Sequence, residues 1–338
     1  MSNQFGAKAV LRSVLLTTGS TYVTYAAGLV TSMLIARGLG PADYGRYAYL
    51  VWLSGLLVLV MNHGLTTSAI RFVSESLGRK SLGDAQDVHR RLQRWQGWSL
   101  LAVGAIFLAA LPALRPAGWE GHLALFAAVA LLASFAKAWY LFSISVAKGY
   151  GRFGIEASSI SLLSLINLAG AGIMALLGAP LDGYMLLFLA ISIAHPLMAA
   201  HQLRRAEIRK GSREIDDELL ARVKPHLAWT MVSTLVAAFS NKAIETYLLN
   251  RLVGAEAVGF FTIAATLARG GVDLLSSGLM TVLMPVLANA YGAGGQQRIH
   301  RLGGDAVRYF HFLGLLLTGV GYFWARPVVE LTYGSSYA

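Results

Sequence analysis

The chain has 338 residues, of which 56% are hydrophobic and only 13% are charged, and its mean hydropathy is +0.57. A soluble domain carries roughly 25% charged residues, so this composition excludes a soluble multi-domain enzyme and indicates a polytopic membrane protein. The absence of cysteine excludes disulfides and thiolate chemistry. In a membrane protein, a net charge of +11 indicates basic cytoplasmic loops and contact with anionic lipid rather than with nucleic acid.

Windows of about 20 mostly apolar residues predict about nine membrane-spanning helices and therefore an all-α fold. The windows are 14–36, 47–70, 98–114, 122–147, 157–177, 181–202, 226–250, 257–290 and 306–325. The segment 203–225 between the sixth and seventh windows is the only long mixed-charge stretch, and we interpret it as a partly helical cytoplasmic linker. Its acidic residues Asp216, Asp217 and Glu218 suit a solvated helix start better than a metal site.

The distribution of lysine and arginine predicts the orientation, because cytoplasmic loops carry an excess of both. With the N-terminus in the cytoplasm, most of the 28 basic residues fall in cytoplasmic segments. The outer segments then hold only Arg37, Arg46, Arg115, Arg251 and Arg326. We therefore expect a multi-pass protein of the inner (plasma) membrane with a cytoplasmic N-terminus.

The two halves of the chain resemble each other when the sequence is shifted by 214 residues. The matched pairs include Arg37 with Arg251, Gly40 with Gly254, Gly45 with Gly259, and Gly64 with Gly278. Because six spans separate equivalent points, the repeats run parallel and are related by an axis along the membrane normal. Two such lobes predict a central cleft between them.

This repeat predicts the domain organisation. We expect a six-helix N-terminal lobe at 1–202, the linker at 203–225, and a partial C-terminal lobe of three helices at 226–338. Residue 338 corresponds to residue 124, so the second lobe lacks counterparts of spans four to six. A complete chain is expected to run about 80–100 residues further, by the length of the first lobe.

The loops that join the first two spans of each lobe carry the matched glycines. They read GLGPADYGRYA at 38–48 and LVGAEAVGFFT at 252–262. The glycines suit a tight helix-to-helix connection, and Pro41 and Asp43 suit a helix start. No Lys-Ser or Lys-Thr pair follows, so a nucleotide phosphate site is not indicated.

Ionisable residues inside the spans are the functional candidates, because they are costly in lipid. Lys242 and Glu245 lie three residues apart in the seventh span and therefore share one helix face. Arg269 and Asp273 lie four residues apart in the eighth, and Lys137 stands alone in the fourth.

These residues suit a polar cavity for an anionic or sugar-bearing substrate. The predicted substrate contacts are Lys242, Arg269, Lys137, Asn241 and Arg71. Glu245 and Asp273 would pair with the cations or couple transport to H⁺ or Na⁺. The alternative for each pair is mutual neutralisation with only a structural role.

No motif supports an enzyme. The histidines lack a spacing such as H-E-x-x-H, and no Ser/His/Asp or protected carboxylate pair is discernible. We therefore expect no catalytic residue, no bound metal and no organic cofactor.

Four segments carry a resemblance to a known family. They are IARGLGPADYGRYA at 35–48, HGL at 63–65, IRFVSE at 70–75 and ELTYGSSYA at 330–338. The chain resembles the oligosaccharide flippases of polysaccharide biosynthesis, which translocate O-antigen and exopolysaccharide repeat units. These proteins belong to the multidrug/oligosaccharidyl-lipid/polysaccharide (MOP) exporter superfamily. Its members typically have more spans than the nine predicted here.

The resemblance implies two six-helix lobes in a V shape. It also implies alternating access that flips undecaprenyl-pyrophosphate-linked oligosaccharide across the inner membrane. The implied partners are that lipid-linked oligosaccharide, membrane lipids and the polysaccharide polymerase or export machinery. Two alternatives stay open: a multidrug or cation antiporter of the same superfamily, which predicts an acidic cavity, and a membrane-embedded polymerase or glycosyltransferase, which needs a large loop with acidic catalytic residues.

Overall fold

The computed structural model describes residues 7–114, 116–212, 214–239 and 243–337, although within the helices the side chains of 7–15, 271–302 and some isolated positions are not described. In these ranges the chain forms helices and turns, with no strand. Helices are expected for an apolar chain in lipid, because each helix satisfies its own backbone hydrogen bonds where no water is present.

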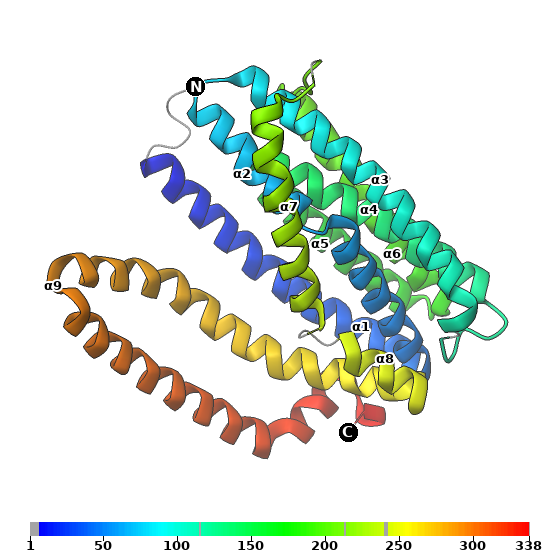
Figure 1. The fold of residues 1–338 in the computed structure, drawn as a ribbon. Helices are drawn as coiled ribbons and strands as arrows, with labels where there is room; N and C mark the ends of the chain where they lie inside the picture. Colours follow the sequence, from blue (N-terminus) through cyan, green and yellow to red (C-terminus); the bar gives the residue numbers. More distant parts are fainter. Residues whose placement is uncertain (1–6, 115, 213, 240–242, 338) are drawn as a thin grey trace. The chain divides into compact units, whose positions relative to one another are not determined.

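Nine α-helices follow one another along the described chain (Figure 1). They are α1 (Ala7–Asn62), α2 (Leu65–Gly78), α3 (Leu82–Leu114), α4 (Leu123–Gly149), α5 (Gly154–Leu176), α6 (Leu181–Arg205), α7 (Asp217–Phe239), α8 (Ala243–Leu252) and α9 (Ala255–Tyr333). Among the described residues, five helices are long and apolar enough to cross a membrane, or six if one bent pair counts as a span. The predicted all-α polytopic membrane fold is confirmed, and α3 to α6 contain the third to sixth predicted spans.

The first predicted span and the larger part of the second lie in α1, which changes direction at Gly40 (Figure 1). Gly40 has φ 75° and ψ 172°, a conformation that favours glycine, and Pro41 begins the helix that follows. Its repeat partner Gly254 also has positive φ, 126°, and lies between α8 and α9. The predicted tight connections are therefore present at both equivalent places.

The second predicted span, 47–70, is not one continuous helix. It breaks between α1 and α2, where Gly64 adopts the left-handed conformation with φ 88°. The break frees backbone carbonyls, and side chains replace the lost helical bonds: Ser99 Oγ donates to Met61 O at 2.7 Å, and His63 Nδ1 lies 3.2 Å from the same oxygen. Side chains satisfy freed backbone groups at breaks in membrane helices in this way.

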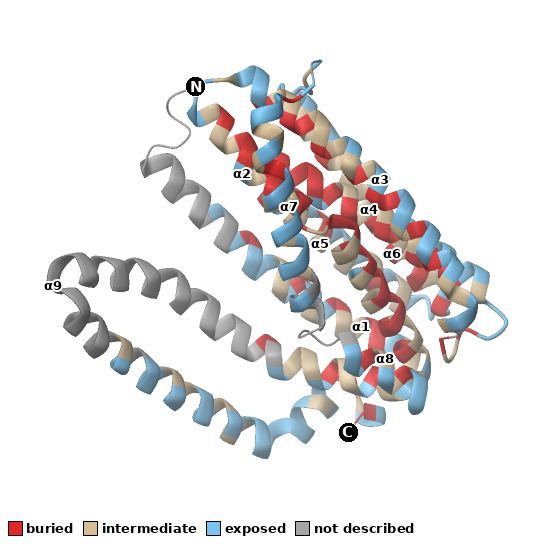
Figure 2. Ribbon diagram, viewed as in Figure 1, coloured by how far each residue is buried: buried red, intermediate tan, exposed pale blue. Residues whose placement is uncertain are grey.

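Among α3 to α6, the helix with the most buried apolar window is α4. Half of that window is buried, against 17% for α5. Figure 2 shows buried residues along α4 where its neighbours cover it. Small residues allow close contact there: a Cβ added to Gly149 would lie 2.8 Å from Val73 Cβ, so α2 and α4 pack almost backbone to backbone.

The helix start that was predicted at the end of the linker is present. Asp217 and Glu218 lie in the first turn of α7, where acidic side chains interact favourably with the helix dipole. The predicted seventh span, 226–250, falls on α7 and α8, which are separated by residues outside the description.

Contacts divide the chain into two compact units, Met1–Gly259 and Phe260–Ala338. The second unit consists of most of α9 and the 3-10 turn Ser335–Tyr337, and it contains the predicted span 306–325. Within it, the segments Gly303–Gly319 and Gly321–Tyr333 are bent by 54° relative to each other. The predicted division into lobes at 203–225 stays a prediction.

Candidate functional site

The structure does not describe the side chains of four predicted site residues. Asn241 and Lys242 are not placed, and the side chains of Arg269 and Asp273 in α9 are not described. Glu245 is exposed in the first turn of α8. The two predicted charge pairs therefore stay predictions.

Lys137 lies inside the first helical bundle, where α4 faces α6. Its ammonium lies 4.5 Å from the centre of the Phe188 ring, and no acidic partner occurs among the described residues. Tyr140, one turn further along α4, packs edge-on against His195 of α6 and hydrogen-bonds Ser159 of α5 at 2.9 Å. The aromatic face stabilises the cation where a carboxylate is missing. The role of Lys137 in substrate binding stays a prediction.

Polar side chains of α2 and α7 meet along a line that we name the α2–α7 seam. It consists of Ser68, Arg71 and Glu75 on α2, and Arg222 and His226 on α7. Ser68 Oγ lies 3.1 Å from His226 Nδ1, and Glu75 Oε1 accepts a hydrogen bond from Arg222 Nη2. The seam thus joins the second span to the first helix after the linker.

The α2–α7 seam carries more positive than negative charge. Glu75 also pairs with Arg79 at 2.8 Å, and Arg71 lies close enough to add to the local field. The hydrogen bond from Arg222 is the main reason why the pKa of Glu75 lies below its ordinary value, and the charges of Arg222, Arg79 and Arg71 contribute. Three cations therefore surround one carboxylate, and Arg71 is exposed. Such a surface attracts anions.

The helix break lies next to the α2–α7 seam. A Cβ added to Gly64 would lie 2.7 Å from Thr230 Cβ, so α7 crosses directly over the break. Thr230 donates its hydroxyl hydrogen to His226 O on its own helix. Only a residue without a side chain allows α7 to pass this closely.

A second contact between the two halves lies at the turns of the repeat, and we name it the outer contact. It consists of Gly45 and Gly259 with the backbone around them. A Cβ added to Gly45 would lie 1.8 Å from Ala255 O, and one added to Gly259 would lie 3.3 Å from Gly45 Cα. Gly45 and Gly259 are partners in the predicted repeat, so the contact joins its two equivalent turns.

Asn250 of α8 adds a polar link close to the outer contact. Its side chain is 2% exposed, accepts a hydrogen bond from Ala117 N at 3.0 Å and donates one to Ala117 O at 3.3 Å. Ala117 lies between α3 and α4 in the first half, so this side chain ties the halves together through backbone groups. Both polar groups of this side chain are therefore used in a structural contact.

The sequence pointed to Arg71 but not to its neighbours in the α2–α7 seam. Ser68 and His226 are 158 residues apart, and Glu75 and Arg222 are 147 residues apart, so periodicity does not connect them. The one available signal was the opposite charge of Glu75 and Arg222. In the described part of the chain, no group of three or more His, Asp or Glu side chains could hold a metal ion.

Comparison with known proteins adds to this geometry. A family model described as "Polysaccharide biosynthesis protein" matches residues 10–290. No curated protein sequence matches the chain.

Two solved structures share the fold. The first, "Inward-facing conformation of a multidrug resistance MATE family transporter of the MOP superfamily", is 16% identical over 93% of this chain and 73% of its own, with a TM-score of 0.70. The second, "Crystal structure of MATE in the bent conformation", is 17% identical over 92% and 78%, with a TM-score of 0.53. The chain therefore shares its fold with these two MATE structures. Because the family match covers most of its length, the chain belongs to the polysaccharide biosynthesis protein family.

Proposed function

We propose that this protein flips undecaprenyl-pyrophosphate-linked oligosaccharide across the inner membrane, supplying repeat units for polysaccharide or O-antigen assembly. The observation that carries the proposal is the match to the polysaccharide biosynthesis family in a chain with a transporter fold. The proposal contains no catalytic step. A polysaccharide polymerase or export complex is the partner that would receive the flipped unit.

The proposed mechanism is alternating access, with the N-terminus in the cytoplasm. The glycan and pyrophosphate cross in a cavity between the lobes, and the prenyl tail stays in lipid. The positive α2–α7 seam supports this, because its exposed Arg71 can attract a pyrophosphate. We assign further substrate contacts to Lys137, Asn241, Lys242 and Arg269. Glu245 and Asp273 would hold these cations or bind a coupling H⁺ or Na⁺.

The test is a flipping measurement with the whole protein in liposomes. The substrate is a fluorescent undecaprenyl-pyrophosphate-linked oligosaccharide, and a membrane-impermeant quencher reports the fraction in the outer leaflet. We expect wild-type protein to equilibrate the substrate between leaflets faster than empty liposomes. Imposed H⁺ and Na⁺ gradients, applied one at a time, identify the coupling ion.

Substitutions locate the substrate contacts. Arg71→Gln is expected to slow flipping by about 10-fold to 100-fold, because a charge-assisted bond to phosphate is worth ~1.5–3 kcal/mol. Arg204→Gln is the matched control, since it removes an exposed arginine at the end of α6. If Arg71→Gln and the double variant Lys242→Ala with Arg269→Ala flip as fast as wild type, the site assignment is wrong.

A multidrug or cation antiporter is the second candidate, because both similar solved structures are titled as MATE proteins. The excess of cations in the α2–α7 seam argues against it, since a cationic drug would be repelled there. Efflux of a cationic dye from the same liposomes, without flipping of the lipid-linked oligosaccharide, would establish the antiporter instead.

A further inference from the structure

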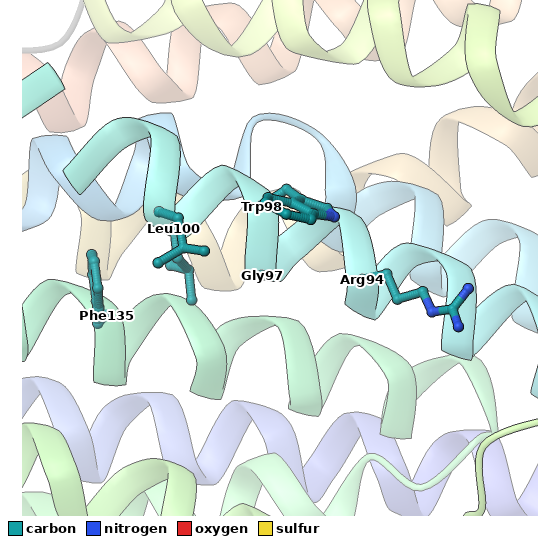
Figure 3. A pocket seen from close by; sticks show the side chains of 6 residues that line it. Arg94, Gly97, Trp98, Leu100 and Phe135 are labelled. Atoms are coloured by element: carbon teal, nitrogen blue, oxygen red, sulfur yellow. The ribbon is translucent and has the colours of Figure 1, made fainter. Parts of the chain in front are cut away.

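A groove opens between α3 and α4 on a surface that neither the α2–α7 seam nor the outer contact uses (Figure 3). Its volume is about 400 Å³, which falls in the range of small-ligand sites. The lining residues are Arg94, Gly97, Trp98, Leu100, Leu101 and Phe135. All but the first are apolar.

Two glycines on one face of α3 explain why the groove exists. A Cβ added to Gly104 would lie 2.8 Å from the Phe135 ring, so α3 and α4 touch there. A Cβ added to Gly97, about two turns closer to the linker, would meet no atom within 4 Å. The helices are therefore in contact at Gly104 and leave an open space at Gly97.

The groove has one polar end and an apolar body. The Arg94 guanidinium lies at the polar end, and the indole nitrogen of Trp98 points toward that end (Figure 3). Trp98 is 70% exposed and Leu101 is 60% exposed, so both would face lipid chains in a membrane. A cation and an indole N–H next to a hydrocarbon surface match the two parts of a phospholipid.

The local charge favours a ligand with a single negative charge. Among the residues that the structure describes, Arg94 is the only cation that lines the groove, and its guanidinium lies 3.6 Å from Glu214 of the linker. The Glu214 side chain is 79% exposed, so the pair is loose and open to competition. A pyrophosphate would bring more negative charge than one guanidinium can balance beside this carboxylate.

We propose that the α3–α4 groove binds an anionic phospholipid of the leaflet next to the linker. Its phosphodiester contacts Arg94 and Trp98 Nε1, and one acyl chain lies over Gly97 and Leu101. The binding is coupled to the linker, because the phosphate competes with Glu214 for Arg94. The linker is held on α3 by other bonds as well, including Gly211 N to Gln86 O at 2.8 Å. The lipid therefore shifts the position of Glu214 without releasing the linker.

The experiment uses the full chain in phosphatidylcholine vesicles that contain increasing fractions of brominated phosphatidylglycerol or brominated phosphatidylcholine. Bromine on the acyl chain quenches nearby indole fluorescence. The chain has seven tryptophans, so the difference between wild type and Trp98→Phe isolates Trp98. Phosphatidylglycerol should half-saturate quenching at a mole fraction about fivefold lower than phosphatidylcholine, as expected for one favourable charge contact.

Two variants test the two ends of the groove. Arg94→Gln should remove the preference for phosphatidylglycerol, whereas Arg204→Gln should keep it. Gly97→Leu fills the open space and should reduce quenching of Trp98 by both lipids. Gly172→Leu is its control, because a Cβ added there also meets nothing within 4 Å, and it should leave quenching unchanged.

Three results would overturn the proposal. Equal half-saturation by both lipids would mean that the groove holds only bulk lipid. A phosphatidylglycerol preference that persists in Arg94→Gln would place the anion elsewhere. Displacement of brominated phosphatidylglycerol by an equimolar amount of polyprenyl pyrophosphate would identify the occupant as the transported class of lipid instead.

Discussion

Gly45 has no space for a single methyl group, because Ala255 O occupies the position of a Cβ. Gly55 lies on the same helix and is exposed, and a Cβ added there would meet nothing within 4 Å. These two glycines of α1 therefore differ, because a side chain would clash at Gly45 and would fit at Gly55. The first allows a contact between the halves, whereas the second is replaceable.

Gly45→Ala is therefore expected to destabilise the protein by ~1–3 kcal/mol, since the backbone must move to admit the methyl group. Gly55→Ala should leave stability unchanged or raise it slightly, because alanine is the better helix former. The measurement is the thermal unfolding midpoint of each purified variant in detergent. Equal midpoints for the two variants would contradict the close approach at the outer contact.

Single residues also show how far the sequence could predict the site. The glycine and proline at residues 40 and 41 carried enough local information to predict the turn, because glycine permits the positive φ of residue 40 and proline suits the first turn of a helix. Lys137 was recognised as a candidate, but its aromatic partner Phe188 comes from a helix 51 positions away, and no local pattern indicates that pairing. The sequence therefore predicted the conformation or the candidate role of single residues, but it did not predict which distant residues they contact.

Among the elements, α2 and α7 show the same limit. The sequence predicted a continuous span at 47–70, yet the helix breaks at Gly64, at the place where α7 crosses it. No pattern within residues 47–70 predicts that α7 crosses the helix at this place. The link between α2 and α7 also depends on Glu75, a carboxylate whose partner Arg222 lies beyond the linker.

The contribution of Glu75 to the stability of the fold should depend on pH. Its pKa in the folded protein lies below the ordinary 4.5, so the ion pair stabilises the fold above that value and is lost as the pH falls through the lowered pKa. Glu75→Gln should lower the unfolding midpoint by a few degrees at most at pH 7, because partly exposed pairs contribute ~0.2–1 kcal/mol. That difference should shrink as the pH falls below 4.5 and through the lowered pKa, as measured by unfolding at a series of pH values.

Glu120→Gln provides the control for this series, because Glu120 is an exposed carboxylate in the loop between α3 and α4. It should give the wild-type midpoint at each pH. A Glu75→Gln deficit that does not shrink as the pH is lowered from 7 to well below 4.5 would show that the side chain acts through packing rather than through its charge.

For the whole molecule, the outer contact has to open if the lobes alternate. The chain contains no cysteine, so introduced pairs can be cross-linked without background. A short thiol cross-linker between Ala117→Cys and Asn250→Cys, whose native groups hydrogen-bond, should stop flipping, and reduction of a cleavable linker should restore it.

The matched pair is Lys148→Cys with Glu156→Cys, which replaces an ion pair within the first six helices. Cross-linking it joins the ends of α4 and α5 and should leave flipping unchanged. Full flipping in the cross-linked 117/250 variant would refute alternating access by opening at this end.

The outer contact also contains the same close approach twice. A Cβ on Gly45 would meet Ala255 O, and a Cβ on Gly259 would lie 2.9 Å from Pro41 O. At the offset of 214 residues, Gly45 corresponds to Gly259 and Pro41 corresponds to Ala255, so each glycine lies against the partner of the residue that lies against the other. The neighbouring positions differ, since Arg46 follows Gly45 and Phe260 follows Gly259. A side chain gained at either glycine would therefore displace the opposite turn, whereas the residues beside the glycines tolerate change.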